Sequence, residues 1–190
     1  MKPSNDTSLL HGAFRPLIQR LEVQLIDAGI PLRVYEAYRS PVRQALLYAK
    51  GRAGGYKDAK KVTNAKAWQS HHQYGLACDF VFLIDGKWTW AEPKPGMWRQ
   101  FHQLAGQLGL QRLSFEMPHV QFAWPLAKLL GGLYPEGGGD EWEAHLGEAI
   151  LSWGPIWRME QGLSHPGAPP IRWPMACEWK SPIEDSAESR

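Results

Sequence analysis

The chain is poor in cysteine and in long apolar segments. It has two cysteines in 190 residues, too few for a disulfide framework. No apolar run approaches the roughly 18 residues that a membrane-spanning helix needs, so we expect no membrane span. Residues 1–7 are polar and lack the apolar core of a signal peptide. We therefore expect the protein to stay in the cytoplasm until it leaves by a route that needs no signal peptide.

The composition is that of a globular protein, with 44% apolar and 21% charged residues. The net charge is only +2, but residues 39–66 hold eight basic residues against one acidic residue, Asp58. This stretch fits either a solvated loop or a rim that attracts an anionic polymer. It has little aromatic interleaving and no nucleic-acid motif accompanies it, so we expect no nucleic-acid partner.

Hydrophobic periodicity predicts a mixture of helices and strands. The expected helices lie near residues 17–25, 41–50 and 98–108, and the expected strands near residues 31–38, 76–84, 87–90 and 119–122. Asp85-Gly86 predicts a tight hairpin between the second and third strands. This order of elements indicates an α+β domain with a small antiparallel sheet flanked by helices.

The composition changes near residue 135, where a glycine-rich stretch predicts a linker. We therefore divide the chain into a main domain (1–134), a Trp- and Pro-rich extension of unknown role (135–180) and a disordered tail (181–190). Asp140 is a candidate helix cap. The tryptophans of the extension either stack on sugars or close a small core: Trp142, Trp153, Trp157, Trp173 and Trp179. A monomer is expected, although no feature of the sequence fixes the oligomeric state.

The strongest functional signal is a histidine and an aspartate seven residues apart, His72 and Asp79. The small residues between them suit a turn that feeds a strand, so a loop would present His72 and the strand Asp79. His119 would arrive from a later strand. Two imidazoles and one carboxylate with an open fourth position suit a catalytic zinc ion. Two alternatives stay open: His72 and Asp79 form a hydrogen-bonded core pair, or the neighbouring His71 is the ligand.

Two further side chains complete a hydrolytic site. Glu116 lies three residues before His119, a spacing that can hold its carboxylate near the open zinc position as a general base. Arg39 follows a predicted strand and precedes a predicted helix, and it is the best candidate to stabilise a negatively charged intermediate. Cys78 lies inside the motif, but we expect it to be a small buried strand residue.

The pattern as a whole resembles the zinc D,D-carboxypeptidase and L-alanyl-D-glutamate endopeptidase family, which includes phage endolysins and vancomycin-resistance carboxypeptidases. The resemblance covers roughly residues 14–123. It rests on Ser70-x-His72-x-x-Gly75-x-Ala77-x-Asp79, on Tyr38-Arg39-Ser40 with Gln44, and on residues 47–52, 62–65 and 118–121.

The resemblance implies a Hedgehog/DD-peptidase-like fold, a Zn²⁺ cofactor and a peptidoglycan stem peptide as substrate. It implies the following roles: His72, Asp79 and His119 as zinc ligands, Glu116 as the base, Arg39 in contact with substrate, and Gln44 and Ser70 in the substrate site. Cleavage of the L-Ala–D-Glu bond during endolysin-like wall lysis, after release through a holin, is the expected function. The alternatives are a D-Ala–D-Ala carboxypeptidase and a non-catalytic wall-binding module with a structural zinc.

Two departures from the family pattern bear on the substrate. Endolysin-type members usually carry Asp three residues before the last histidine, whereas this chain has Glu116. The segment between Gly109 and Glu116 is also shorter than in typical endolysins and lacks their tryptophan-glycine-glycine run. These differences concern substrate preference more than metal chemistry.

Overall fold

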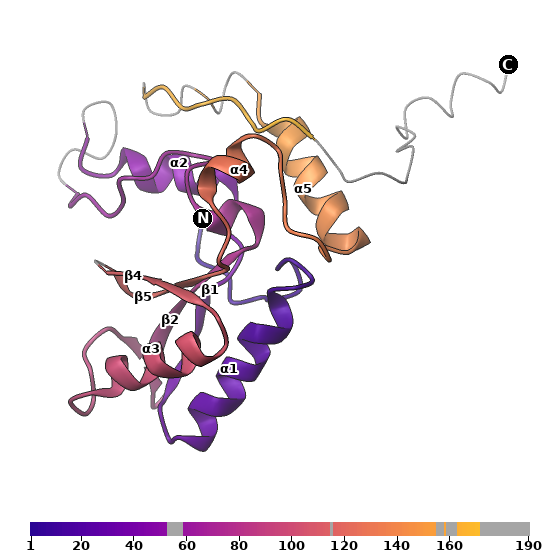
Figure 1. The fold of residues 1–190 in the computed structure, drawn as a ribbon. Helices are drawn as coiled ribbons and strands as arrows, with labels where there is room; N and C mark the ends of the chain where they lie inside the picture. The colour runs from indigo at the N-terminus through magenta and orange to yellow at the C-terminus, as the bar shows by residue number, and fades with distance from the viewer. Residues whose placement is uncertain (53–58, 115, 155–157, 159–162, 172–190) are drawn as a thin grey trace, which may run out of the picture.

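The computed structural model describes residues 1–52, 59–114, 116–154, 158 and 163–171. A small antiparallel sheet lies between two groups of helices (Figure 1). The helices are α1 (Arg15–Asp27), α2 (Pro41–Ala49), α3 (Met97–Gln107), α4 (Leu126–Leu130) and α5 (Asp140–Ser152), with a 3-10 turn η1 (His71–Tyr74). The strands are β1 (Leu32–Glu36), β2 (Ala77–Ile84), β3 (Lys87–Thr89), β4 (Gln111–Leu113) and β5 (Glu116–Gln121). The predicted α+β class is confirmed.

The sheet places one aspartate between two other strands. Its order is β1-β2-β5-β4, and β3 pairs with β2. The β1–β2 register pairs Asp79 with Glu36 after an irregularity in β1, and the β2–β5 register pairs Asp79 with His119. Residues that are far apart in the sequence therefore meet at the middle strand.

The two faces of β2 have different environments because successive side chains alternate. Cys78 and Phe80 are completely buried on one face, and the Phe80 ring lies 5.2 Å from the Phe101 ring of α3. The burial of Cys78 confirms that it is a small strand residue. Asp79 and Val81 lie on the other face. The apolar face fixes the strand against the helices, which leaves the polar face for a site.

Local sequence signals explain the helices on either side. In α1 the apolar residues at helical spacing, Ile18, Leu21 and Leu25, are all buried. In α2 the Ser40 hydroxyl accepts a hydrogen bond from the Arg43 backbone N–H, as a helix cap does. The short elements η1, β4 and α4 were not predicted. Each has only three to five residues, too few to show a helical or strand repeat of apolar residues.

Some predicted boundaries hold and others do not. Asp85 and Gly86 adopt φ angles of 48° and 74°, the left-handed values that a tight hairpin needs. The prediction that β5 begins at His119 is wrong, because the strand already begins at Glu116. The prediction that Asp140 caps α5 is also wrong: Gly139 occupies the cap position and Asp140 is the first helical residue.

The described part of the extension packs on the main domain. Trp142, Leu146 and Trp153 belong to the same buried cluster as the core of the main domain. The Trp142 indole N–H donates a hydrogen bond of 2.8 Å to the Tyr74 carbonyl. These two tryptophans therefore close a core, as one of the two alternatives expected. The boundary at residue 135 stays a prediction.

Several predictions fall on residues outside the described ranges. They concern part of the basic stretch (residues 53–58), Trp157, Trp173, Trp179 and the tail at 181–190. Among the helices that the structure describes, none combines the length and the apolar character needed to cross a membrane.

Candidate active site

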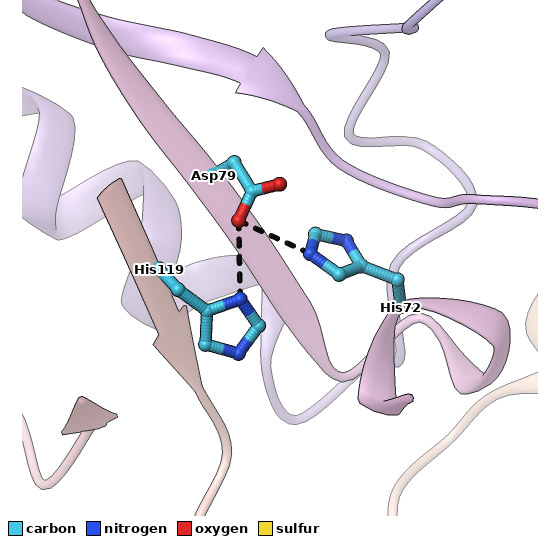
Figure 2. Close-up of side chains that lie close together, drawn as sticks. All are labelled: His72, Asp79 and His119. Carbon is cyan, nitrogen blue, oxygen red and sulfur yellow. Dashed lines mark hydrogen bonds and ion pairs between the residues drawn. The ribbon is translucent and has the colours of Figure 1, made fainter. Parts of the chain in front are cut away.

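Three predicted side chains from three elements converge on one point. The ligand atoms of His72, Asp79 and His119 lie within 4.8 Å of one another. Asp79 Oδ1 lies 3.2 Å from His72 Nε2 and 3.1 Å from His119 Nδ1 (Figure 2). Ligand atoms about 2 Å from a tetrahedral zinc ion lie about 3.3 Å from one another. The spacing of the three side chains therefore fits a metal ion.

His72 is oriented by a backbone carbonyl. The residue is buried in η1, and its Nδ1 lies 2.7 Å from the carbonyl oxygen of Ala37. That contact places the ring proton on Nδ1 and leaves the lone pair of Nε2 free. Nε2 is buried and makes no hydrogen bond to any residue that the structure describes. A buried nitrogen without a hydrogen bond, 3.2 Å from the Asp79 carboxylate, fits a metal ligand, and this role of His72 stays a prediction.

His119 is oriented by a side chain two residues along β5. Its Nε2 lies 3.1 Å from Gln121 Oε1, and its Nδ1 faces Asp79. With the proton on Nε2, Nδ1 offers its lone pair to a metal. Gln121 is itself buried at the end of the strand. The contact between Gln121 and His119 was not predicted, although Gln121 lies in the segment 118–121 that carries the family resemblance.

Asp79 uses its two oxygens for different partners. Oδ1 faces the two histidines, and Oδ2 accepts a hydrogen bond of 2.8 Å from the Arg39 guanidinium. The same Arg39 nitrogen lies 2.7 Å from Glu36 Oε2, and Arg43 binds the other Glu36 oxygen. A row of alternating charges thus runs from the sheet to α2. Arg39 holds a ligand here, and its predicted contact with substrate stays a prediction.

Charge and burial together separate the pKa values of the two histidines. Burial lowers the pKa of His72, and the nearby Arg39 lowers it further. Burial also lowers the pKa of His119, but the hydrogen bond and charge of Asp79 outweigh it and raise that pKa above its ordinary value. Burial raises the pKa of Asp79, yet the two histidines hold it well below its ordinary value. The carboxylate is therefore ionised and suited to a cation.

Gln44 and Ser70, both predicted in the substrate site, make hydrogen bonds that hold Arg39 and the η1 turn in place. Gln44 is completely buried; its Oε1 accepts a hydrogen bond from Arg39, and its Nε2 donates one to the Ala65 carbonyl. Gln44 is not among the residues that line the cleft, and its predicted contact with substrate stays a prediction. The Ser70 hydroxyl accepts from the His72 backbone N–H and caps η1. Ser70 also lines the cleft, so contact with substrate stays a prediction for this residue.

The alternative ligand His71 lies outside the converging triad. Its Nε2 contacts the Trp124 carbonyl at 2.7 Å. Among the described residues, the set of ligand atoms close enough to share an ion contains His72 and not His71. The structure therefore favours His72.

Glu116 stands at the rim of the triad. Its Oε2 lies 3.9 Å from His119 Nδ1, and its side chain is 42% exposed. A half-exposed carboxylate beside the triad can reach both a water molecule and a bound substrate. This position suits the predicted general base, and that role stays a prediction.

Two cavities of about 570 and 550 Å³ meet at this centre. Arg39, Val62, Thr63 and Glu116 line both cavities, so together they form one cleft that passes the triad. The described cleft residues include four cations, Arg39, Arg43, Lys50 and Lys61, and three acids, Glu36, Asp79 and Glu116. The predicted attraction of this rim for an anionic polymer stays a prediction. A cleft of this size suits a short peptide.

Fold and site together define an α+β protein with a His-Asp-His triad, spaced for a metal ion, in a cleft. A family model described as D-alanyl-D-alanine carboxypeptidase (VanY) matches residues 7–118, more than half of the chain, so the chain belongs to this family. It is also 30% identical over 109 residues to the peptidoglycan L-alanyl-D-glutamate endopeptidase CwlK of Bacillus subtilis (strain 168). That alignment covers 54% of this chain and 64% of the relative, so the chain spans less than two thirds of that protein.

Proposed function

We propose that the protein is a zinc-dependent peptidase that cuts the L-Ala–D-Glu bond of peptidoglycan stem peptides. The observation that carries this proposal is the triad of His72, Asp79 and His119, with an unsatisfied buried nitrogen and a carboxylate, Glu116, at its rim. The similarity to an L-alanyl-D-glutamate endopeptidase supports the choice of bond. Lys50 and Lys61 in the cleft suit a substrate rich in carboxylates.

In this proposal His72, Asp79 and His119 would hold zinc, which would supply a Lewis acid that polarises the peptide carbonyl and activates water. The Glu116 carboxylate accepts the proton of the attacking water and then gives it to the leaving amine. Arg39 keeps the second oxygen of Asp79 engaged, so Oδ1 stays directed at the histidines. The carbonyl of Ala37 and the side chain of Gln121 keep the two rings in their binding tautomers.

The direct test is mass spectrometry of muropeptides after digestion with the zinc-loaded protein. New peptides that begin with D-Glu would support the endopeptidase. Release of free D-Ala would instead support the second candidate, a D-Ala–D-Ala carboxypeptidase, which the description of the matching family favours. Wall binding without any cleavage would support the third candidate, a non-catalytic module.

The role of Glu116 has its own test. Glu116→Gln keeps the shape of the side chain but removes the base, so we expect zinc to stay bound while turnover falls about 100- to 10,000-fold. Glu136→Gln is the matched control, because Glu136 is exposed and does not line the cleft. Near-normal turnover of Glu116→Gln would show that another group is the base.

A further inference from the structure

Three aromatic side chains cluster on the sheet beyond the triad. Tyr35 of β1 lies between two indoles, with its ring centroid 5.1 Å from Trp88 and 5.2 Å from Trp90. Both contacts are edge-to-face, at 76° and 77°. Trp88 is 37% exposed and Trp90 is 55% exposed. We call Tyr35, Trp88 and Trp90 the aromatic platform. A contiguous cluster of exposed aromatic groups, unlike single exposed residues, is a candidate binding surface.

The platform belongs to the same cleft as the triad. The cavity of about 550 Å³ has Tyr35 and Trp90 among its walls, and also Asp79 and Glu116. Val81 lines it too, and it shares a face of β2 with Asp79 because it lies two residues further along the strand. Leu83, the next residue on that face, pairs with Trp88. Asp79, Val81 and Leu83 therefore connect the triad to the platform along one face of β2.

The chemistry of the platform suits a sugar ring. Aromatic faces carry a negative quadrupole that attracts the C–H groups on the apolar face of a pyranose. The Trp88 and Trp90 indole N–H groups make no hydrogen bond to the residues that the structure describes, so both can donate to hydroxyl or acetamido oxygens. Lys50 lines the same cavity and adds a further donor.

We propose that the aromatic platform binds the N-acetylated sugar to which the stem peptide is attached. This subsite rests on the proposed function, because a peptidoglycan stem peptide carries that sugar on its first residue, L-Ala. Tyr35 and Trp90 of the platform share one cavity with Asp79 and Glu116, so a sugar bound there places the first peptide bonds of the stem beside the triad. The distal D-Ala–D-Ala bond lies several residues further from the sugar. The subsite therefore selects cleavage near the sugar.

The first test compares one stem peptide with and without N-acetylmuramic acid. We expect the wild-type protein to have the higher kcat/KM for the glycosylated peptide, by about two- to tenfold, the range of one aromatic contact. Trp90→Ala should bring the ratio of the two kcat/KM values close to one, and Trp90→Phe should keep most of the preference. The control is Leu151→Ala, which removes a similarly exposed apolar side chain from α5. An unchanged ratio in Trp90→Ala would overturn the proposal.

The second test needs no hydrolysis, so it separates failure of the subsite from failure of the proposed function. N-acetylmuramic acid without a peptide is titrated into the zinc-loaded protein, and the indole N–H signals are followed by NMR, with Trp90→Phe assigning the Trp90 signal. A saturable shift of the platform indoles supports the subsite even if neither peptide is cleaved. No shift, or a shift with the sugar-free peptide alone, would assign the platform to another ligand and overturn the proposal.

Discussion

The ligands on strands and the ligand on the 3-10 turn are held in different ways. Asp79 and His119 lie opposite each other in the sheet, and each is fixed by a polar side chain, Arg39 and Gln121 respectively. His72 stands on η1 and is fixed by a backbone carbonyl, that of Ala37. The strand ligands thus depend on side chains that a substitution can remove. The turn ligand depends on the path of the backbone.

The backbone path around His72 is held in turn by packing from distant segments. Tyr74 ends η1, and its carbonyl accepts the buried indole N–H of Trp142 from α5. The Tyr74 hydroxyl donates to the Trp68 carbonyl. Gly75 follows with φ 63°, and a Cβ there would lie 2.7 Å from the Leu9 carbonyl oxygen, so glycine is required. The position of His72 therefore depends on the packing of the aromatic core, whereas the positions of Asp79 and His119 depend on the hydrogen-bonded sheet.

The largest effect is expected where a strand ligand is lost outright. Asp79→Ala removes the carboxylate that faces both histidines and leaves the buried Arg39 guanidinium with Glu36 as its carboxylate partner. We expect zinc binding to be lost and hydrolysis to fall to background. Metal content after dialysis and the rate of muropeptide cleavage measure the two effects.

The control for Asp79→Ala is Cys78→Ala, which changes a residue on the buried face of the same strand. We expect the Cys78→Ala protein to keep its zinc. Asp79→Asn is a second variant that keeps the shape of the side chain, so loss of zinc in this variant is not explained by a packing defect. Stoichiometric zinc in both Asp79 variants would show that the triad is not the metal site.

A smaller effect is expected from the support of the second strand ligand. Gln121→Ala removes the acceptor that fixes the His119 ring, and loss of such an outer partner lowers metal affinity about 10- to 100-fold. Gln111→Ala is the matched control, since Gln111 pairs with Gln121 across the sheet but is exposed. Competition with a zinc chelator measures both affinities. Equal affinities would mean that the sheet alone orients His119.

The triad was predictable because its signals are local. His72 and Asp79 lie in one short motif, with a glycine turn between them and a buried strand behind them. His119 and Glu116 lie in a second motif at a fixed spacing. Each motif needs only its own secondary structure to present its ligands, and the sheet register then brings the two motifs together.

The supporting partners were not predictable for the opposite reason. Glu36 reaches the site because of an irregularity in the β1–β2 register, which no local pattern indicates. Gln44 was expected near substrate, but tertiary packing buries it behind Arg39. The role of α5 likewise depends on a contact between Trp142 and Tyr74, which are far apart in the sequence. Such contacts follow from the whole fold rather than from any segment of it.

The two histidines should also differ in how protons compete with zinc. Zinc binds neutral imidazole, so affinity falls as a ligand histidine becomes protonated. The pKa of His119 is raised and that of His72 is lowered, so between these values only His119 carries a proton. As pH falls through the raised pKa of His119, zinc affinity should decrease about tenfold per pH unit, the slope for one proton.

Zinc titrations from pH 8.5 down to pH 6 would measure that slope. It should be close to zero at the alkaline end, where both rings are neutral, and approach one below the pKa of His119. A slope of two near pH 6.5 would mean that both histidines exchange a proton there, which would remove the distinction between the strand and turn ligands.

The smallest effect is expected at the support of the turn ligand. Trp142→Phe keeps an aromatic ring in the core but removes the N–H that satisfies the buried Tyr74 carbonyl. We expect a loss of about 1–3 kcal/mol in the free energy of unfolding, measured with urea, since an acceptor is left unsatisfied.

Trp124→Phe is the matched control: its indole N–H also donates to a carbonyl, that of Leu133, but at the surface. There water replaces the lost donor, so the cost should stay below about 0.5 kcal/mol. Zinc affinity should fall slightly in the Trp142 variant and stay constant in the Trp124 variant. Equal stability of the two variants would mean that the extension packs against η1 without supporting it.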